Sequence, residues 1–182
     1  MPDDHFVCRC VLCHDYGDRN DADSVDLGII EDIQQYGWSV IMVPEDDIGP
    51  GFAYTIGLAH SYGAPELAMF GLDVRLMHRA LNNLAQEAAN GTALADGQEH
   101  AEVLERYLVA LRRADQRWHR TFFGRAIGFY RRPPLPVLQV CWPDSKGAFH
   151  WQEDSVEQNR QSQPQLWVPP AEHPRGVWTA EV

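Results

Sequence analysis

The chain has 182 residues, with 26 Asp or Glu against 15 Lys or Arg, which gives a formal net charge of -11. This length suits one domain with a sizeable core, and the fractions of hydrophobic (45%) and charged (23%) residues are ordinary for a globular protein. The acidic balance argues against binding nucleic acid or anionic lipid through a general basic field.

The N-terminal segment and the cysteines together indicate a cellular compartment. Residues 1–5 are acidic and polar, so they lack the basic and apolar regions of a signal peptide. No apolar run reaches the roughly 18 residues that a membrane span needs. We therefore expect a cytoplasmic protein whose four cysteines are thiols or metal ligands rather than disulfides, because the cytoplasm is reducing.

Two amphipathic helices and three short strands are predicted in the first half of the chain. Apolar residues at helical spacing predict one helix that Asp23 or Ser24 caps and Gly37 ends. A second helix begins after a cap at Asp73 and ends at Gly91. Runs rich in β-forming residues predict strands over 38–43, 52–56 and 66–70.

The second half of the chain is less regular. Residues 103–113 fit a strand or a helix, and aromatic spacing predicts a helix over 115–130. A hairpin follows, with strands over 137–142 and 148–151, and the chain from Gln152 onward is expected to be loop.

Mixed strands and helices with a hairpin indicate a single α+β domain, with helices packed on one face of a mainly antiparallel sheet. The expected division is a Cys/His-rich arm over 1–23, the domain over 24–166 and an irregular tail over 167–182. The sequence contains no internal repeat.

The most specific motif is a cluster of soft metal donors within seven residues: Cys8, Cys10, Cys13 and His14. Zinc favours thiolate and imidazole ligands, so we expect a zinc site here. A closed tetrahedral site needs four ligands, and His5, His14 or Cys141 could complete the three thiolates. Two alternatives stay open, a Cys10–Cys13 redox pair and ordinary reduced cysteines without a metal.

A glycine break after the second strand suggests the lip of a pocket. His60 and Ser61 follow this break, and Glu66 begins the next strand, so acid–base side chains gather here. Tyr54 and Thr55 are adjacent in the strand and face opposite sides of the sheet, and both are candidate ligand-binding residues. A Ser–His–Glu hydrolase is one hypothesis, although no Gly-x-Ser-x-Gly motif occurs. Turn and cap roles are the alternative.

Aromatic residues and one carboxylate flank the predicted hairpin turn. Trp142, Trp151 and Asp144 could line an aromatic pocket, with Asp144 as a catalytic carboxylate opposite His60. The alternative is that the aromatic rings pack across the strands while Asp144 binds turn amides.

Eight arginines lie between residues 106 and 132 of this acidic chain. Arg117 and Arg120 are the predicted contacts for a small anionic ligand or an acidic protein partner. The alternative is a solvated helix face whose arginines pair with the acidic arm.

Five strings of residues stand out: Gly37-Trp38, Phe52-Ala-Tyr-Thr-Ile-Gly-Leu58, Phe70-Gly-Leu-Asp73, Leu81-Asn82 and Pro136-Val-Leu-Gln-Val-Cys-Trp-Pro-Asp144. In this order they resemble the bacterial domain of unknown function 4262 family, over roughly residues 24–166. The resemblance implies a fold and no reaction. It also implies a Cys-x-x-Cys near the N-terminus, which Cys10 and Cys13 match. The chain departs from the family pattern at Ala64, where members often have His, and at His150, where they tend to have Pro.

These observations lead to two functional hypotheses. The first is a small cytoplasmic accessory domain that binds a metal, with zinc favoured, and a small anionic ligand or an acidic protein partner. The second is a small metal-dependent or metal-stabilised enzyme, for example a hydrolase, with a pocket around the Tyr54–Glu66 segment and Asp144. Neither hypothesis includes nucleic acid or a membrane.

Overall fold

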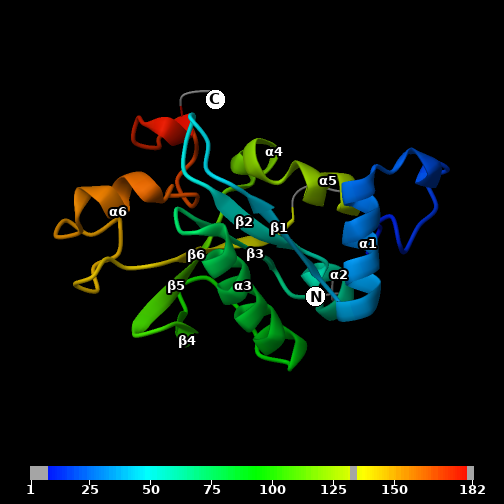
Figure 1. Cartoon of the computed structure of the whole chain (residues 1–182), viewed down its shortest axis with the longest axis horizontal. Coiled ribbons are helices and arrows are strands. Elements are labelled where there is room, and N and C mark those ends of the chain that lie inside the picture. The colour runs from blue at the N-terminus through cyan, green and yellow to red at the C-terminus, as the bar shows by residue number, and fades with distance from the viewer. Residues whose placement is uncertain (1–7, 132–134, 180–182) are drawn as a thin grey trace, which may run out of the picture.

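A six-stranded sheet forms the centre of the structure, a computed structural model that describes residues 8–131 and 135–179 (Figure 1). The strand order is β1-β2-β3-β6-β5-β4, and neighbours are antiparallel except for the parallel pair β3 and β6. The strands are β1 (Ser39–Val43), β2 (Phe52–Ile56), β3 (Glu66–Phe70), β4 (Glu99–Leu104), β5 (Tyr107–Arg113) and β6 (Val137–Cys141). A single α+β domain with a mainly antiparallel sheet, as the sequence predicted, is confirmed.

Helices cover both faces of this sheet. They are α1 (Ser24–Tyr36), α2 (Leu58–Tyr62), α3 (Val74–Ala89), α4 (His119–Phe122), α5 (Gly124–Tyr130) and α6 (Glu157–Ser162). Short 3₁₀ turns occupy Arg19–Asp21, Gln116–Trp118 and Val177–Thr179. None of the helices within the described ranges is long and apolar enough to cross a membrane.

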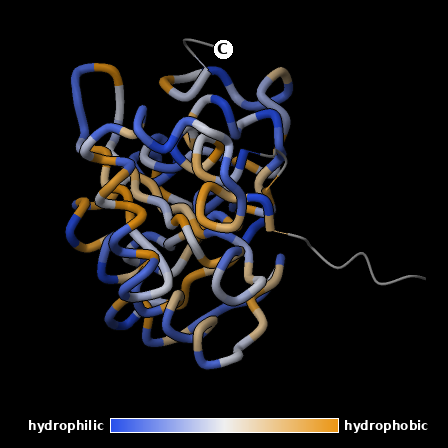
Figure 2. Tube along the Cα trace, turned by 90° about the vertical axis from the view of Figure 1, so that its right-hand side faces the viewer, coloured by the Kyte–Doolittle hydropathy of each residue, from blue (hydrophilic) through white to orange (hydrophobic). Residues whose placement is uncertain are grey.

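Two apolar clusters lie on opposite faces of the sheet, and helices cover both of them. Leu67 and Met69 of β3 pack with α3, whereas Ala68 and Phe70 pack with α1 and α5 on the opposite face. Every residue of β3 and of β6 is buried, so both faces of these strands need a cover. The prediction of helices on one face is therefore wrong. Figure 2 shows the apolar segments running through the middle of the molecule.

Several predicted elements are confirmed at their boundaries. Strands β2 and β3 cover the predicted residues, and β1 and β6 each differ from the prediction by one residue at one end. The side chains of Asp23 and Asp73 cap α1 and α3, because each carboxylate accepts two N–H groups of the first helical turn. Gly37 ends α1 in the left-handed conformation, with φ of 94°.

Other elements differ from the prediction. The helix predicted over 115–130 is broken at Phe123, whose φ of -115° and ψ of 36° separate α4 from α5. Residues 103–113 contain the end of β4, a turn at residues 105–106 and strand β5. The predicted return strand 148–151 is reduced to one bridge between Pro143 and Phe149. Helices α2 and α6 were not predicted.

The register of the sheet defines two ends that matter for function. Glu66 pairs with Val137 at one end, because β3 and β6 are parallel and begin together. Phe70 and Cys141 close the same two strands at the opposite end. Helix α2, which follows the last residue of β2, therefore lies at the Glu66 end.

Candidate metal centre and the neighbouring groove

Four potential metal ligands converge beside α2. The sulfur atoms of Cys8, Cys10 and Cys13 and a ring nitrogen of His60 all lie within 4.8 Å of one another. His60 Nδ1 lies 3.7 Å from Cys8 Sγ and 3.3 Å from both Cys10 Sγ and Cys13 Sγ. A tetrahedral zinc ion, with Zn–S of about 2.3 Å and Zn–N of about 2.0–2.1 Å, separates sulfur and nitrogen ligands by about 3.6 Å. The cluster therefore has the size of a Cys₃His zinc site.

A tight turn in the arm brings the three cysteines together. The carbonyl of Cys10 accepts hydrogen bonds from the N–H groups of Cys13 and His14, at 3.1 and 3.0 Å. Val11 N–H donates to the carbonyl of Phe129 at 3.0 Å, which joins this turn to the end of α5. Cys10 is fully buried in the core and Cys13 is exposed, so the site lies at the surface with one buried ligand.

His60 is presented by the short helix α2, which needs a glycine before it. Gly57 has φ of 118°, in the left-handed region that side chains rarely adopt. A Cβ atom at Gly57 would also lie 2.8 Å from Ile33 Cγ1 and 2.9 Å from the carbonyl oxygen of Gly37. The chain can therefore turn from β2 into α2 only with glycine at this position.

Of the three candidates for the fourth ligand, His14 and Cys141 are not among the converging donors, and His5 lies outside the described residues. His14 is exposed, and its ring packs edge-on against Tyr16 with centroids 4.7 Å apart. The tight turn after Cys10 places the donors close in space, yet it leaves His14 outside the group of four. His60, which the sequence suggested as a catalytic residue, provides the fourth donor instead, 47 residues after Cys13 in the chain.

The local electrostatics explain why such a cluster needs a cation. Burial raises the pKa of the Cys10 thiol to about 12, and the Cys8 sulfur adds to this rise. Burial also raises the pKa of Cys13. Three adjacent thiolates are therefore unfavourable by themselves, and a bound metal ion is the group that would stabilise them.

Glu66 is a buried carboxylate that holds α2 in place. Its Oε1 accepts the N–H groups of Gly57 and Ala59, both at 3.1 Å, and its Oε2 accepts the hydroxyl of Thr55 at 2.6 Å. The Tyr130 hydroxyl donates to Oε1 and accepts the N–H of His60 at 3.3 Å. Burial, followed by the Glu66 charge, raises the pKa of Tyr130. The network supports the backbone of the helix that carries His60.

Asp144 does not join this group. It follows β6 at the Cys141 end of the sheet, opposite to the end where Glu66 and α2 lie. Its carboxylate accepts the N–H groups of Lys146, Ala148 and Val156, at distances of 2.8 to 3.1 Å. These bonds lower the pKa of Asp144. The prediction that His60, Glu66 and Asp144 converge across one cleft is wrong, because the parallel pair β3–β6 separates them.

The Ser–His–Glu arrangement is also not formed. The Ser61 hydroxyl donates to the carbonyl of Gly37 at 2.6 Å, and His60 Nδ1 faces the cysteine sulfurs. Thr55 is buried, and so is Tyr54, whose pKa burial raises to about 12. Neither of these two candidate ligand-binding side chains reaches a described surface.

The aromatic candidates are held by other parts of the core. Trp142 Nε1 donates to the carbonyl of Phe70 at 2.7 Å. Trp151 stacks on Phe149 with centroids 4.7 Å apart, and the guanidinium of Arg112 lies 5.3 Å from the Trp151 ring. Trp142 and Asp144 border a hollow of about 630 Å³, as the sequence predicted, whereas Trp151 is not part of its lining.

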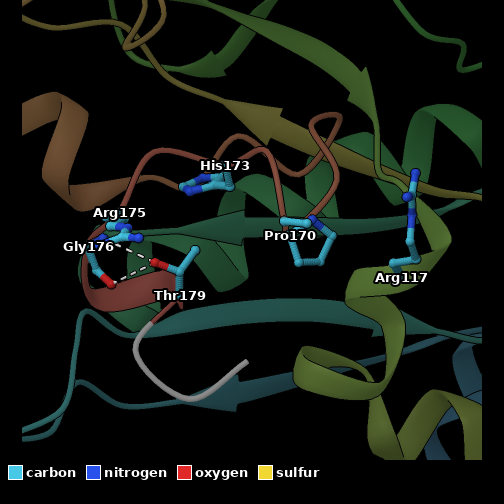
Figure 3. A pocket seen from close by; sticks show the side chains of 7 residues that line it. Arg117, Pro170, His173, Arg175, Gly176 and Thr179 are labelled. Atoms are coloured by element: carbon cyan, nitrogen blue, oxygen red, sulfur yellow. Dashed lines mark hydrogen bonds between the residues drawn. The ribbon is translucent and has the colours of Figure 1, made fainter.

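The arginine candidates are partly neutralised by the chain itself. Arg117 makes a two-point ion pair with Asp115, and Arg117 lowers the pKa of Asp115 to about 2. Arg117 also borders a shallow hollow near His173 and Arg175 (Figure 3). Both nitrogens of the His173 ring are engaged, one by the N–H of Gln165 and the other by the carbonyl of Pro174. Arg120 is exposed.

A groove of about 540 Å³ lies beside the cysteine turn, between the arm, α1 and α5, which stand next to each other in Figure 1. Its apolar lining includes Val11, Leu12, Ile29, Ile30 and Phe129. Ion pairs across its rim join Arg125 to Asp23 and Asp26, at 2.7 and 2.8 Å, and Arg131 to Asp18. These ion pairs agree with the alternative interpretation of the sequence, in which the arginines form ion pairs with the acidic arm.

Gly124 and Gly128 line the α5 wall of the groove, four residues apart and therefore on one helix face. A Cβ atom added at either position meets nothing within 4 Å, so both glycines border open space. The sequence prediction did not include this groove. The signal for it was this glycine pair inside the helix predicted over 115–130.

Comparisons with known proteins agree with the resemblance seen in the sequence. The model of the family described as Domain of unknown function (DUF4262) matches residues 32–156. His60 lies inside this match, whereas the three cysteines precede it. No curated protein and no solved structure matches the chain.

Proposed function

Because the chain belongs to the DUF4262 family, whose description assigns no function, we propose a function from the geometry: a binding domain in which zinc fastens the N-terminal arm to α2. The observation that carries the proposal is the convergence of three sulfurs and one imidazole nitrogen within 4.8 Å. Zinc is the ion of choice because it favours sulfur and nitrogen ligands in tetrahedral geometry.

The role that this donor set supports is structural. Four protein ligands fill a tetrahedral coordination sphere, whereas catalytic zinc sites keep one position for water or substrate. A reducing compartment such as the cytoplasm, which the sequence favours, would keep the thiols available for the metal. The enzyme hypothesis has less support, because no acid–base pair of described residues meets at the cluster.

The metal would also complete the neighbouring groove. Val11 and Leu12 form one wall, and they lie between the ligands Cys10 and Cys13. The groove volume falls in the range of small-molecule sites, and its lining combines apolar residues with charged ones. The ligand that fits is a small molecule with an apolar body, whose acidic group would meet Arg125 or Arg131.

An acidic protein partner has less support than a small ligand. A small ligand needs to replace only one carboxylate at Arg125 or Arg131, whereas an acidic protein surface would face all of the carboxylates that bind these two arginines. The surrounding arm is itself acidic and would repel it.

Limited proteolysis tests whether zinc fastens the arm. Arg9 is exposed between two of the proposed ligands, so trypsin can cut after it once the arm is released. We expect chelator treatment to raise the cleavage rate after Arg9 at least tenfold, and added zinc to reverse the change. Cleavage after Arg120, exposed in α4, is the internal control and should change less than twofold. An equal rise at both sites, or no rise after Arg9, would contradict the proposal.

A further inference from the structure

The two edges of the sheet differ in how they are protected. Edge strand β4 has a register shift between His100 and Leu104, a positive φ of 65° at Glu102 and a charged first residue, Glu99. Bulges and charges of this kind prevent another strand from pairing with an edge. Edge strand β1 has none of these devices: its residues Ser-Val-Ile-Met-Val are uncharged and pair with β2 in unbroken register. Among the described residues, no strand pairs with the outer side of β1.

A hollow of about 460 Å³ adjoins the first half of β1, between α1 and α3. The aromatic residues of its lining are Tyr36, Trp38 and Tyr62. Trp38 is fixed there, because its Nε1 donates to Asn82 Oδ1 at 2.8 Å and its ring lies 6.2 Å from that of Tyr62. Tyr36 and Tyr62 are 57% and 40% exposed, so their rings are available to a ligand.

Acidic side chains lie near both ends of this edge, and the one basic residue in the lining of the hollow is His78. Asp32 is the one carboxylate in the lining of the hollow, where it accepts the Ser39 hydroxyl at 2.7 Å, and the lining contains no Lys or Arg. At the other end of β1, the exposed acids Glu45, Asp46 and Asp47 follow the strand. These carboxylates favour a positively charged ligand at this edge.

We propose that the open edge of β1 binds an extended basic segment of a protein partner, which adds a strand to the sheet and inserts a Lys or Arg side chain between Tyr36, Trp38 and Tyr62. Strand addition provides affinity through backbone hydrogen bonds, while a side pocket provides specificity. Aromatic rings beside a carboxylate attract a cation by cation–π contact and by charge.

A second copy of this chain fits the edge less well. Antiparallel pairing of two β1 strands would bring Asp32 of one copy towards the Glu45–Asp47 loop of the other, and like charges would repel. The proposal goes beyond the zinc-stabilised groove, because none of the residues that line this hollow belongs to the metal cluster.

A fluorescein-labelled ten-residue peptide of alternating lysine and valine is the probe. Fluorescence anisotropy should show saturable binding, and a matched glutamate–valine peptide should bind at least tenfold more weakly. Two further versions of the lysine peptide carry methyl groups on the odd-numbered or on the even-numbered backbone nitrogens. One of the two should bind at least tenfold more weakly than the unmethylated peptide, because methylation removes the donors that an added strand needs. Equal binding of the methylated and unmethylated peptides would overturn strand addition.

Two lysine substitutions locate the site. Met42 on β1 and Leu108 on β5 are 46% and 48% exposed, so Met42→Lys and Leu108→Lys add the same charge at similarly exposed positions. We expect Met42→Lys to weaken peptide binding at least tenfold and Leu108→Lys to weaken it less than twofold. Equal effects would show general charge attraction and overturn the proposal. If sedimentation experiments show a dimer that Met42→Lys abolishes, a second copy of this chain occupies the edge and the proposal of a basic partner is wrong.

Discussion

The carboxylate of Glu66 and the imidazole of His60 are connected through the first turn of α2. Glu66 Oε1 accepts the N–H groups of Gly57 and Ala59, which precede His60, and Tyr130 connects the same carboxylate to the N–H of His60. A carboxylate at a helix N-terminus is favourable because the helix dipole is positive there. Glu66 thus fixes the orientation in which His60 faces the cysteines.

We expect Glu66→Gln to weaken zinc binding about 10- to 100-fold, the usual effect of losing a group that orients a metal ligand. Competition with a chromophoric chelator measures the affinity. Asp144→Asn is the matched control, because Asp144 is also buried and also accepts backbone N–H groups, at the opposite end of the sheet. Zinc affinity that falls equally in both variants would show that Glu66 acts only through general stability.

Filling the groove should block it without unfolding α5. Gly128→Leu places a side chain in open space on the groove wall, and leucine has a higher helix propensity than glycine. We expect at least a tenfold loss in binding of 8-anilinonaphthalene-1-sulfonate, a fluorescent probe with an apolar body and an anionic group. Gly28→Leu in α1 is the control, since Gly28 also borders open space but does not line the groove. If both variants bind the probe as the unmodified chain does, the groove is not the binding site.

The sequence predicted the fold well where local signals decide the structure. The sequence predicted Asp73 as the cap of α3 and Asp23 or Ser24 as the cap of α1, and Asp73 and Asp23 are the caps in the structure. Strands β2 and β3 are short apolar runs bounded by glycine. The break at Phe123 and the second layer of helices depend on tertiary packing, which periodicity does not describe.

The metal site was predicted in part, for a physical reason. Cys8, Cys10 and Cys13 are close in sequence, so their spacing is visible. His60 reaches them only because the chain turns at Gly57 and α5 holds the cysteine turn through Phe129. These are long-range contacts, and no local pattern distinguishes His60 from His14 as the fourth ligand.

The buried His150 should make stability depend on pH. Its Nε2 donates to the carbonyl of Pro164 at 3.0 Å, and its Nδ1 has no partner among the described residues. Burial lowers the pKa of His150 from 6.5 to about 4. As the pH falls from 6.5 towards 4, the unfolded chain takes up a proton that the folded chain does not, so the free energy of unfolding falls by about 3 kcal/mol in total.

His150→Gln should remove this part of the pH dependence, because glutamine does not titrate. Urea unfolding at pH 7 and pH 4.5 measures the difference, with His14→Gln as the control at an exposed position. Acid release of a metal affects all three proteins alike, so it cancels in the comparison. A pH dependence that His150→Gln leaves unchanged would assign the effect to other groups.

The zinc content of three proteins tests the central claim most directly. Elemental analysis after purification under reducing conditions should find about one zinc per chain in the unmodified protein and in His14→Gln, and most of it lost in His60→Gln. This result follows because His60, and not His14, stands 3.3 Å from Cys10 Sγ and Cys13 Sγ. An unmodified protein without bound metal, or a His60→Gln variant that keeps its zinc while His14→Gln loses it, would contradict the account.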